Sequence, residues 1–359
     1  MDRRTLLGLG AAGAAGLLAA GCSSSTTGGT PAGSAAPAAS GSAAGGKKLS
    51  VVSVVNGPLG DASFFDDAER GIQKLKASGH TTQTVQSEAN NPAQWKTNVE
   101  SVSTGKWDIV VVGSSQMVDI VDGAAKKFPN QKFIIYDDAP KAIPTNLASI
   151  QFKQNEGSFL AGALAALVVT NKDKFPNATG NAKTIGLVGG MDIPVINDFV
   201  AGYKKGAESV DPSVQVKVSY VGNFTDAQKG YDQAKAMFDQ GADVVYQVAG
   251  GAGIGVLKAA KEAKRYAIGV DSNQNELQPG FILASMLKNI GEAIVTAAEA
   301  ADAGKLEYGK VTSYGLANKG VGLTFEKNGN LVPADMQAKI NDLATQVASG
   351  KIVVPIAPR

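Results

Sequence analysis

Short polar clusters that follow predicted strands are the residues of this sequence best suited to binding chemistry. Two of them carry carboxylates, Asp137-Asp138 and Asp271-Ser272-Asn273, and a third carries the hydroxyls of Ser114 and Ser115. Carboxylates accept hydrogen bonds, and serine hydroxyls both donate and accept them. Three more clusters supply an amide or bare glycine backbone: Asn56-Gly57, Gly189-Gly190 and Gly250-Gly251. Together these groups can hold a small polar molecule.

Residues for covalent or metal-assisted catalysis are scarce. The chain has one histidine, His80, and one cysteine, Cys22. His80 lies in a polar stretch before a predicted strand, which favours a solvated turn residue, and no cluster has metal-ligand spacing. The carboxylates of Asp66-Asp67 and of Asp137-Asp138 are sequence neighbours, so they point different ways on a helix or strand. We expect no catalytic residue and no metal, although carboxylates from separate loops leave hydrolysis as a disfavoured alternative.

A glycine-rich run partly matches a dinucleotide-binding fingerprint. Gly250-Gly251-Ala252-Gly253-Ile254-Gly255 follows a strand and opens a helix, and Asp271 lies about twenty residues further on. The position of the third glycine holds Val256 instead. We therefore expect no cofactor. The run is either a tight strand-to-helix turn or a source of backbone amides for a polar ligand group.

The N-terminus has the composition of an export signal. A charged tip, Asp2-Arg3-Arg4, precedes the apolar stretch Leu6–Ala20, which is too short to span a bilayer. Cys22 follows Ala20-Gly21 and resembles the acylated cysteine of a bacterial lipobox. The paired arginines also resemble a twin-arginine motif, so the Sec and twin-arginine routes both stay open. The sequence predicts a signal peptide at 1–21 and a lipid on Cys22 that attaches the protein to the extracytoplasmic face of the cell membrane.

A long tether and a large body follow the cysteine. Residues 22–48 are almost entirely Ser, Thr, Gly, Ala and Pro, which cannot bury enough apolar area to fold. The formal net charge is only +2 and no basic block occurs, so nucleic acid is not an expected partner. The body, residues 49–359, contains no cysteine for a disulfide.

Strand and helix patterns alternate along the body. Apolar runs predict buried strands at Leu49–Val55, Ile109–Gly113, Phe133–Asp137, Ile185–Gly189, Val244–Val248 and Ala267–Asp271. More polar strands are predicted at Thr82–Val85 and Val214–Val221. Helical periods occur at Phe65–Ala77, Val118–Phe128, Phe159–Thr170, Phe199–Val210, Ala227–Phe238 and Val256–Ala263.

This alternation predicts an α/β protein with two doubly wound parallel-sheet lobes joined by a hinge, as in type I periplasmic binding proteins. We expect the first lobe at about 49–152 plus 272–310 and the second at about 153–271, with 311–359 unassigned. Ligands of such sheets bind beyond the carboxyl ends of the strands. The polar clusters should therefore face each other across a cleft.

Seven segments of the body resemble the basic membrane protein family, exported lipoproteins that serve ABC importers and whose studied members bind nucleosides. The segments are Gly60–Asp66, Glu156–Gly162, Ile185–Met191, Gly222–Asp226, Gly241–Val245, Ile268–Gln274 and Ser285–Lys288. They occur in the family's order and cover nearly the whole body.

The resemblance implies a ligand-binding role for individual residues. The family stacks the base between two aromatic rings, which correspond here to Phe64 and Phe224. Asp271 and Lys288 match residues that bind the ribose hydroxyls, and Gly250 matches a glycine that packs close to the ligand. Lys288 is expected to begin a helix, where an ion pair with Glu292 four residues later is the simpler alternative.

One position departs from the family pattern. Many relatives carry asparagine after the first aromatic residue, where it can hydrogen-bond the edge of the base, and this chain has Phe65 instead. Asp66 or Asp137 can supply polar contacts instead. Weaker candidates are Asp61, Phe65, Ser114 and Ser115.

These observations predict a monomeric, lipid-anchored solute-binding protein that takes a nucleoside, with a purine favoured, and delivers it to an ABC permease. A sugar or other small polar solute is the alternative among binding functions. An extracytoplasmic nucleoside or glycoside hydrolase and a ligand sensor that serves a receptor are the alternatives from other classes.

Overall fold

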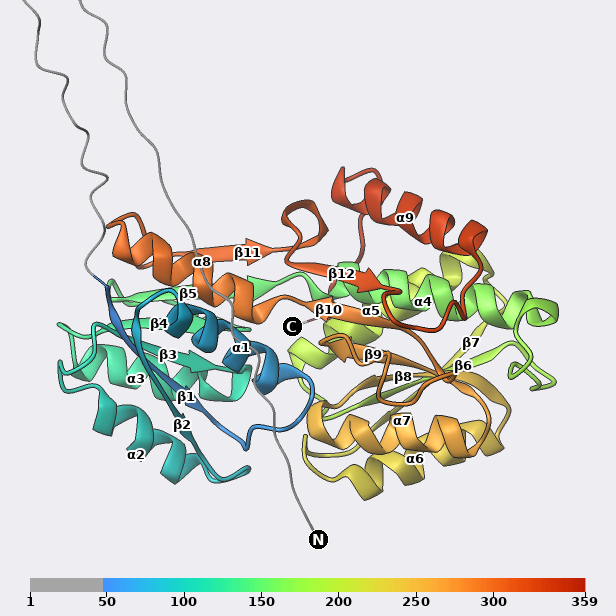
Figure 1. Ribbon diagram of the computed structural model, residues 1–359, viewed down its shortest axis with the longest axis horizontal. Helices are drawn as coiled ribbons and strands as arrows, with labels where there is room; N and C mark the ends of the chain where they lie inside the picture. Colours follow the sequence, from blue (N-terminus) through green and yellow to red (C-terminus); the bar gives the residue numbers. More distant parts are fainter. Residues whose placement is uncertain (1–47, 359) are drawn as a thin grey trace, which may run out of the picture. The chain divides into compact units, whose positions relative to one another are not determined.

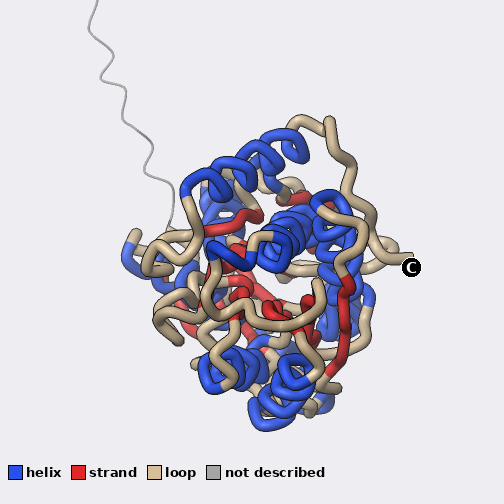
Figure 2. Tube along the Cα trace, turned by 90° about the vertical axis from the view of Figure 1, so that its right-hand side faces the viewer, coloured by secondary structure: helices blue, strands red, loops and turns tan. Residues whose placement is uncertain are grey.

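The computed structural model describes residues 48–358, which contain two six-stranded sheets with helices on both faces (Figures 1 and 2). The predicted doubly wound α/β class is thereby confirmed. Cys22, the predicted signal peptide and the predicted tether up to residue 47 lie outside the described residues. Between residues 48 and 358, no helix is long and apolar enough to cross a membrane.

The first sheet is entirely parallel, with the strand order β11-β5-β4-β3-β1-β2. Its strands are β1 (Ser50–Val55), β2 (Thr81–Gln86), β3 (Ile109–Gly113), β4 (Lys132–Tyr136), β5 (Leu147–Phe152) and β11 (Val311–Tyr314). Successive side chains of a strand point to opposite faces. Val52 and Val54 therefore share a core with α2 (Pro92–Val102) and α3 (Val118–Lys127), on the lower left in Figure 1. Val51 points to the opposite face and belongs to a second core, which it shares with α1 (Phe64–Ala77) and α8 (Ile290–Asp302).

The second sheet repeats this arrangement in the order β12-β10-β9-β8-β6-β7. Its strands are β6 (Thr184–Gly189), β7 (Gln215–Tyr220), β8 (Ala242–Val248), β9 (Tyr266–Asp271), β10 (Ile282–Lys288) and β12 (Val321–Thr324), and only β12 runs antiparallel. The helices α6 (Ala227–Asp239) and α7 (Gly253–Glu262) cover one face. The helices α4 (Gln154–Thr170) and α5 (Pro194–Val210) cover the other, together with α9 (Ala334–Ala348).

Three crossovers join the lobes. The chain passes between them from β5 to α4, from β10 to α8 and from β11 to β12. The expected lobe boundaries therefore need correction, because β10 pairs with β9 and β12 in the second sheet. Of the segment 272–310, only the part from α8 onward belongs with the first lobe. The unassigned C-terminal segment is divided, with β11 in the first sheet and β12 in the second.

The helices α4 and α5 begin at Gln154 and Pro194, earlier than the predicted starts at Phe159 and Phe199. Pro194 occupies the first turn of α5, where its missing N–H leaves no hydrogen bond unmade. Their packing depends on close backbone contact. A Cβ atom on Gly206 would lie 1.9 Å from the carbonyl oxygen of Phe159, so only glycine fits there.

Each strand and helix predicted by pattern is present, whereas β5, β10 and the C-terminal strands were not predicted. Two local predictions were wrong. His80 is buried, and its Nδ1 accepts a hydrogen bond of 3.1 Å from the backbone N–H of Leu49. Lys288 ends β10 instead of beginning a helix, because the chain continues the sheet up to this residue before it crosses at Asn289.

Candidate ligand-binding site

A cavity of about 360 Å³ lies between the carboxyl ends of the two sheets and is lined by residues of both lobes. In each sheet the strand order reverses between the first and third strands of the lobe, β1 and β3 or β6 and β8. Ligands of open parallel sheets bind outside such a reversal. The residues that follow these four strands therefore meet around the cavity. Asn56, Ser114 and Gly250 line it directly, and Gly190 lies against the ring of Phe224, which also lines it.

Of the described residues, Lys288 is the one cationic side chain that lines this cavity, and only 2% of its surface is exposed. Its ammonium group forms an ion pair with Asp137, which directly follows β4 of the other lobe. Its Nζ also lies 5.4 Å from the ring centroids of Phe64 and Phe152 and 5.5 Å from that of Phe199. A carboxylate and three aromatic faces thus offset the cost of burying this charge.

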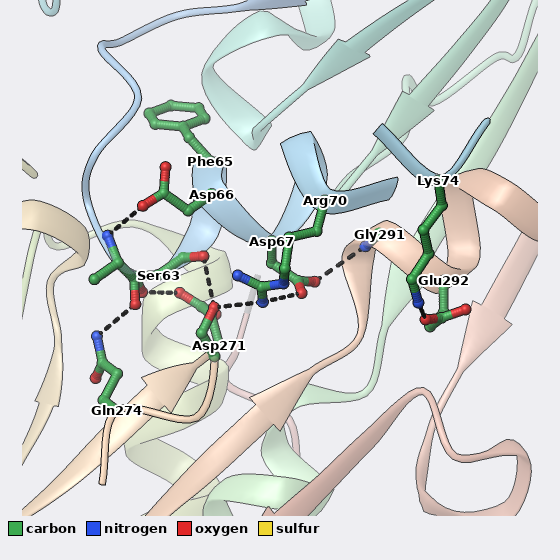
Figure 3. A network of polar contacts seen from close by, with 12 residues as sticks. Ser63, Phe65, Asp66, Asp67, Arg70, Lys74, Asp271, Gln274, Gly291 and Glu292 are labelled. Carbon is green, nitrogen blue, oxygen red and sulfur yellow. Dashed lines mark hydrogen bonds and ion pairs between the residues drawn. The ribbon is translucent and has the colours of Figure 1, made fainter. Parts of the chain in front are cut away.

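Asp271 supplies a buried carboxylate at the end of β9. The hydroxyl of Ser63, from the first lobe, donates a hydrogen bond of 2.6 Å to its Oδ2 (Figure 3). Burial raises the pKa of Asp271 to about 7, while the positive charge of Lys288 and the Ser63 hydrogen bond act in the opposite direction. A ligand hydroxyl that donates to this carboxylate would favour its charged form.

Further hydrogen bonds between the lobes surround Asp271 (Figure 3). The hydroxyl of Ser272 donates to the carbonyl oxygen of Ser63 at 3.0 Å, and Arg70 donates to the Ser272 hydroxyl at 2.9 Å. Gln274 Nε2 donates to the carbonyl oxygen of Ala62 at 3.0 Å. The loop that leads into Phe64 is thereby fastened to the strand end that carries Asp271.

The start of α1 is also fastened to α8 within the first lobe. Asp67 accepts a hydrogen bond of 3.0 Å from the backbone N–H of Gly291, and Lys74 forms an ion pair with Glu292 (Figure 3). The alternative pairing of Lys288 with Glu292 is therefore wrong, because each has a different partner.

The two aromatic candidates, Phe64 and Phe224, come from opposite lobes and both line the cavity. Phe64 begins α1, and its ring centroid lies 5.6 Å from that of Tyr136. Phe224 follows β7, and its ring lies so close to Gly190 that a Cβ atom there would be 2.3 Å from the ring carbons. Gly250 lies beside Phe224 with φ +55, a left-handed conformation that favours glycine.

A chain of neutral polar side chains lies at the ends of β1 and β3. Ser114 Oγ donates to Asn56 Oδ1 at 3.0 Å, and Asn56 Nδ2 donates to Gln116 Oε1 at 3.3 Å. Gln116 Nε2 lies 3.6 Å from Met191 Sδ of the second lobe. Ser115 also lines the cavity, at the start of a short 3₁₀ helix, Ser115–Met117.

Three of the cavity residues that lie at the carboxyl ends of strands have left-handed backbone conformations that non-glycine residues seldom adopt. They are Ser114 with φ +80, Asp137 with φ +86 and Asp271 with φ +62, each at the carboxyl end of a strand. Such strain costs about 1–3 kcal/mol per residue and concentrates at functional sites.

Of the remaining candidates near the start of α1, Asp61 and Phe65 line the cavity and Asp66 does not. Asp61 is buried at the cavity wall, and its carboxylate accepts hydrogen bonds from the N–H groups of Ser63, Phe65 and Asp66, so it caps α1. Burial nevertheless raises the pKa of Asp61. Phe65 lines the cavity. Asp66 does not, because its carboxylate binds the N–H groups of Gly60 and Ala62.

The glycine-rich run has a packing role at its later positions. A Cβ atom on Gly253 would lie 1.8 Å from Gln247 Oε1, and one on Gly255 would lie 1.8 Å from the carbonyl oxygen of Ala227. These contacts place the start of α7 against β8 and α6 and leave Gly250 and Gly251 at the cavity. The sequence left two interpretations of the run, a tight strand-to-helix turn and a source of backbone amides for a ligand. The later glycines fit the first, because they allow α7 to begin close to its neighbours.

Sequence reasoning missed three residues of the site. Phe199 lies in the helical pattern of α5 and looks like any core residue, while Ser63 and Gln116 each have a partner in the other lobe, Asp271 and Met191, that local sequence does not reveal. Ser63 lies within the Asp61–Phe64 motif, which was the available signal. Among residues 48–358, no group of three or more His, Cys, Asp or Glu side chains is arranged to hold a metal ion.

Comparison with known sequences gives one family. The sequence model described as ABC transporter substrate-binding protein PnrA-like matches residues 48–356. The ABC transporter nucleoside-binding protein BmpA of Lactococcus lactis is 32% identical over 333 residues, which cover 86% of this chain and 89% of the relative. Basic membrane protein A2 of Borrelia garinii is 29% identical over 313 residues, covering 86% and 88%.

Solved structures agree with this result. A solute-binding protein of an ABC transporter system from Aeropyrum pernix has a TM-score of 0.77 and 28% sequence identity, covering 86% of this chain and 94% of its own. Another from Conexibacter woesei has a TM-score of 0.67 at 23% identity, covering 86% and 99%, and supports the fold alone. Proteins of this family are substrate-binding proteins of ABC transporters and not enzymes, and they are associated with the membrane on its extracytoplasmic side. The two solved structures named above are likewise solute-binding proteins of ABC transporters. The chain belongs to the PnrA-like family of ABC transporter substrate-binding proteins, as the seven matching segments of its sequence indicated.

Proposed function

We propose that this protein binds a nucleoside, with a purine base favoured, between Phe64 and Phe224 and presents it to an ABC permease. The observation that carries the proposal is that the two rings come from opposite lobes and line one cavity. A base stacked on an aromatic ring gains about 1–3 kcal/mol per base. Two rings would supply a substantial part of the roughly 8 kcal/mol that a micromolar affinity requires.

The charged residues of the cavity suit the sugar. Asp271 has a carboxylate that accepts hydrogen bonds, and Lys288 has an ammonium group that donates them, as ribose hydroxyls require. Lys288 is already paired with Asp137, and it is the only cationic side chain that lines the described cavity. A phosphate group would find little compensation there, so an unphosphorylated nucleoside fits better than a nucleotide. The Lactococcus lactis relative is named as a nucleoside-binding protein.

We also propose that the protein acts as a monomer attached to the membrane by a lipid on Cys22, after removal of residues 1–21. The segment 22–48 would then connect the anchor to the lobes. A single cysteine behind an apolar stretch supports this proposal. Mass spectrometry of the membrane fraction tests it, because acylation of Cys22 adds a lipid mass that the Cys22→Ser variant lacks.

Replacing Phe224 by alanine tests the nucleoside proposal. We expect the affinity for a purine nucleoside to fall more than tenfold in calorimetry, because one stacking face is lost. The matched control is Tyr231→Ala, which removes an aromatic ring of the same lobe that does not line the cavity. An unchanged dissociation constant in Phe224→Ala would contradict the two-ring arrangement.

A thermal-shift screen distinguishes the other solute classes, since a ligand stabilises the folded state in proportion to ln(1 + [L]/Kd). Sugars that raise the melting temperature while nucleosides do not would replace the proposal by a sugar-binding function. Recovery of free base after long incubation with a labelled nucleoside would indicate hydrolysis.

A further inference from the structure

The cavity has two chemically different ends. We call Asp137, Asp271 and Lys288 the hinge-side end, because they lie where β4, β9 and β10 end. The strands β4 and β9 lie beside β5 and β10, which lead into crossovers between the lobes. Asn56, Ser114 and Gln116 follow β1 and β3, further from the crossovers, and we call this set the outer end. A ligand held at the hinge-side end by its hydroxyl groups must direct its remaining edge elsewhere.

Hydrogen bonds at the outer end have a defined direction. Ser114 donates to the carbonyl oxygen of Asn56, and the amide nitrogen of Asn56 donates to the carbonyl oxygen of Gln116. Gln116 Nε2 has two hydrogens, and its partner is the Met191 sulfur at 3.6 Å, which is a weak acceptor. Gln116 therefore has donor capacity left for a ligand, while its carbonyl oxygen already accepts a hydrogen bond.

We propose that Gln116 is a specificity-determining residue that selects bases with a carbonyl oxygen at the edge facing the outer end. This inference rests on the proposed nucleoside function and adds the class of base to it. A carbonyl oxygen accepts from the free Nε2 hydrogen. An exocyclic amino group at the same place would bring two donors together and leave both without an acceptor, which is costly once water is excluded.

Gln116 takes the role left open by Phe65. The residue after the first stacking ring is apolar here, so it cannot hydrogen-bond the base edge. Gln116 belongs to the same lobe and lines the same cavity. Its contact with Met191 joins the two lobes, so the donor is in place when the lobes meet.

Inosine and adenosine are the appropriate pair of probes because they share sugar and ring shape. They differ in the carbonyl or amino group at position 6 and in the protonation of the adjacent ring nitrogen. We expect isothermal titration calorimetry of the wild-type protein to show inosine binding at least tenfold tighter than adenosine. The ratio is informative because both ligands are neutral and respond equally to general changes of charge or stability.

The substitution Gln116→Glu keeps the shape and replaces the donor by an acceptor. The expected result is a reversed preference, with adenosine at least threefold tighter than inosine. Gln116→Met removes the donor without adding charge, and the affinity ratio should then approach one. The control is Gln83→Glu, an exposed position on β2 of the same lobe that does not line the cavity, where the wild-type ratio should remain.

The outcomes separate the inference from the function on which it rests. Binding of both nucleosides with a ratio that neither Gln116 substitution changes would overturn the inference and leave the nucleoside function standing. Absence of binding by both nucleosides to the wild-type protein would overturn the nucleoside function and the inference with it.

Discussion

The hinge-side and outer ends of the cavity differ in the charge of the side chains that form them. The hinge-side end consists of buried charges, with Lys288 paired to Asp137 and surrounded by aromatic rings. The outer end consists of neutral amides and a hydroxyl, linked in one direction from Ser114 to Gln116. A buried charge is costly without a partner, whereas a neutral amide costs less to remove from water and bury. We infer that the hinge-side end supplies affinity and that the outer end supplies discrimination.

The two ends also differ in how they depend on contact between the lobes. At the hinge-side end, Asp137 of the first lobe meets Lys288 of the second, and Ser63 of the first lobe meets Asp271 of the second. At the outer end, the bonds among Asn56, Ser114 and Gln116 lie within the first lobe. Changes at the hinge-side end should therefore affect folding and affinity together, and changes at the outer end should affect selectivity.

Substitution of Lys288 by methionine should have the largest effect. It leaves the Asp137 carboxylate buried without its cation, and breaking a buried ion pair costs about 3–5 kcal/mol of unfolding free energy. Urea denaturation measures this loss. We also expect nucleoside binding to become undetectable, because the donor to the sugar is gone.

The control for Lys288 is Lys258→Met, which removes an exposed lysine 3.8 Å from Glu262 on α7. Exposed pairs of this kind contribute little to stability. Equal denaturation midpoints for the Lys258 and Lys288 variants would show that the hinge-side pair is no more important than a surface contact.

The pH dependence of Asp271 should be the next largest effect. Burial raises its pKa from 3.8 to about 7, so between these values the folded state holds a proton that the unfolded chain has released. The stability that this carboxyl contributes is present below its unfolded pKa and is lost as the pH rises through about 7. Ligand hydroxyls require the charged form, so affinity should follow the opposite trend and weaken about tenfold between about pH 8 and about pH 6.

Calorimetry across that pH range provides the measurement. Asp271→Asn should bind more weakly, with an affinity that no longer changes through the same range. A wild-type dissociation constant that stays constant would mean that the ligand does not engage the charged carboxylate. In that case the hinge-side end would owe its affinity to Lys288 and the rings.

The sequence was informative where one segment carries its own signal. The apolar runs of β1, β3 and β4 are buried on both faces, which is why they were recognisable as parallel strands. Phe64, Phe224 and Asp271 lie in short motifs, and the structure brings all three to one cavity. Asp271 was recognisable from its place at the end of a predicted strand, and the two phenylalanines were selected because their motifs resemble those of the family.

The sequence was uninformative where the signal depends on distant contacts. The strand β10 was missed because only Asn289 separates it from α8, so that Lys288 looked like a helix start. The role of Gln116 depends on Asn56 and Met191, which lie far from it in the sequence. The alternative pairing of Lys288 with Glu292 was wrong because each finds a partner that is distant in sequence. Local spacing cannot report such partners.

Substitution of Gly190 by alanine should have the smallest effect and tests how firmly the second ring is placed. A Cβ atom there would lie 2.3 Å from the ring carbons of Phe224, so the ring must move away from β6. Because Phe224 is only half-buried and has space to move, we expect a moderate loss of nucleoside affinity, about three- to tenfold, in calorimetry. The control is Gly123→Ala in α3, where nothing lies within 4 Å of the added carbon and the affinity should not change. If Gly190→Ala changes the inosine-to-adenosine ratio as strongly as Gln116→Glu, discrimination depends on ring position, and the proposed division between the two ends of the cavity fails.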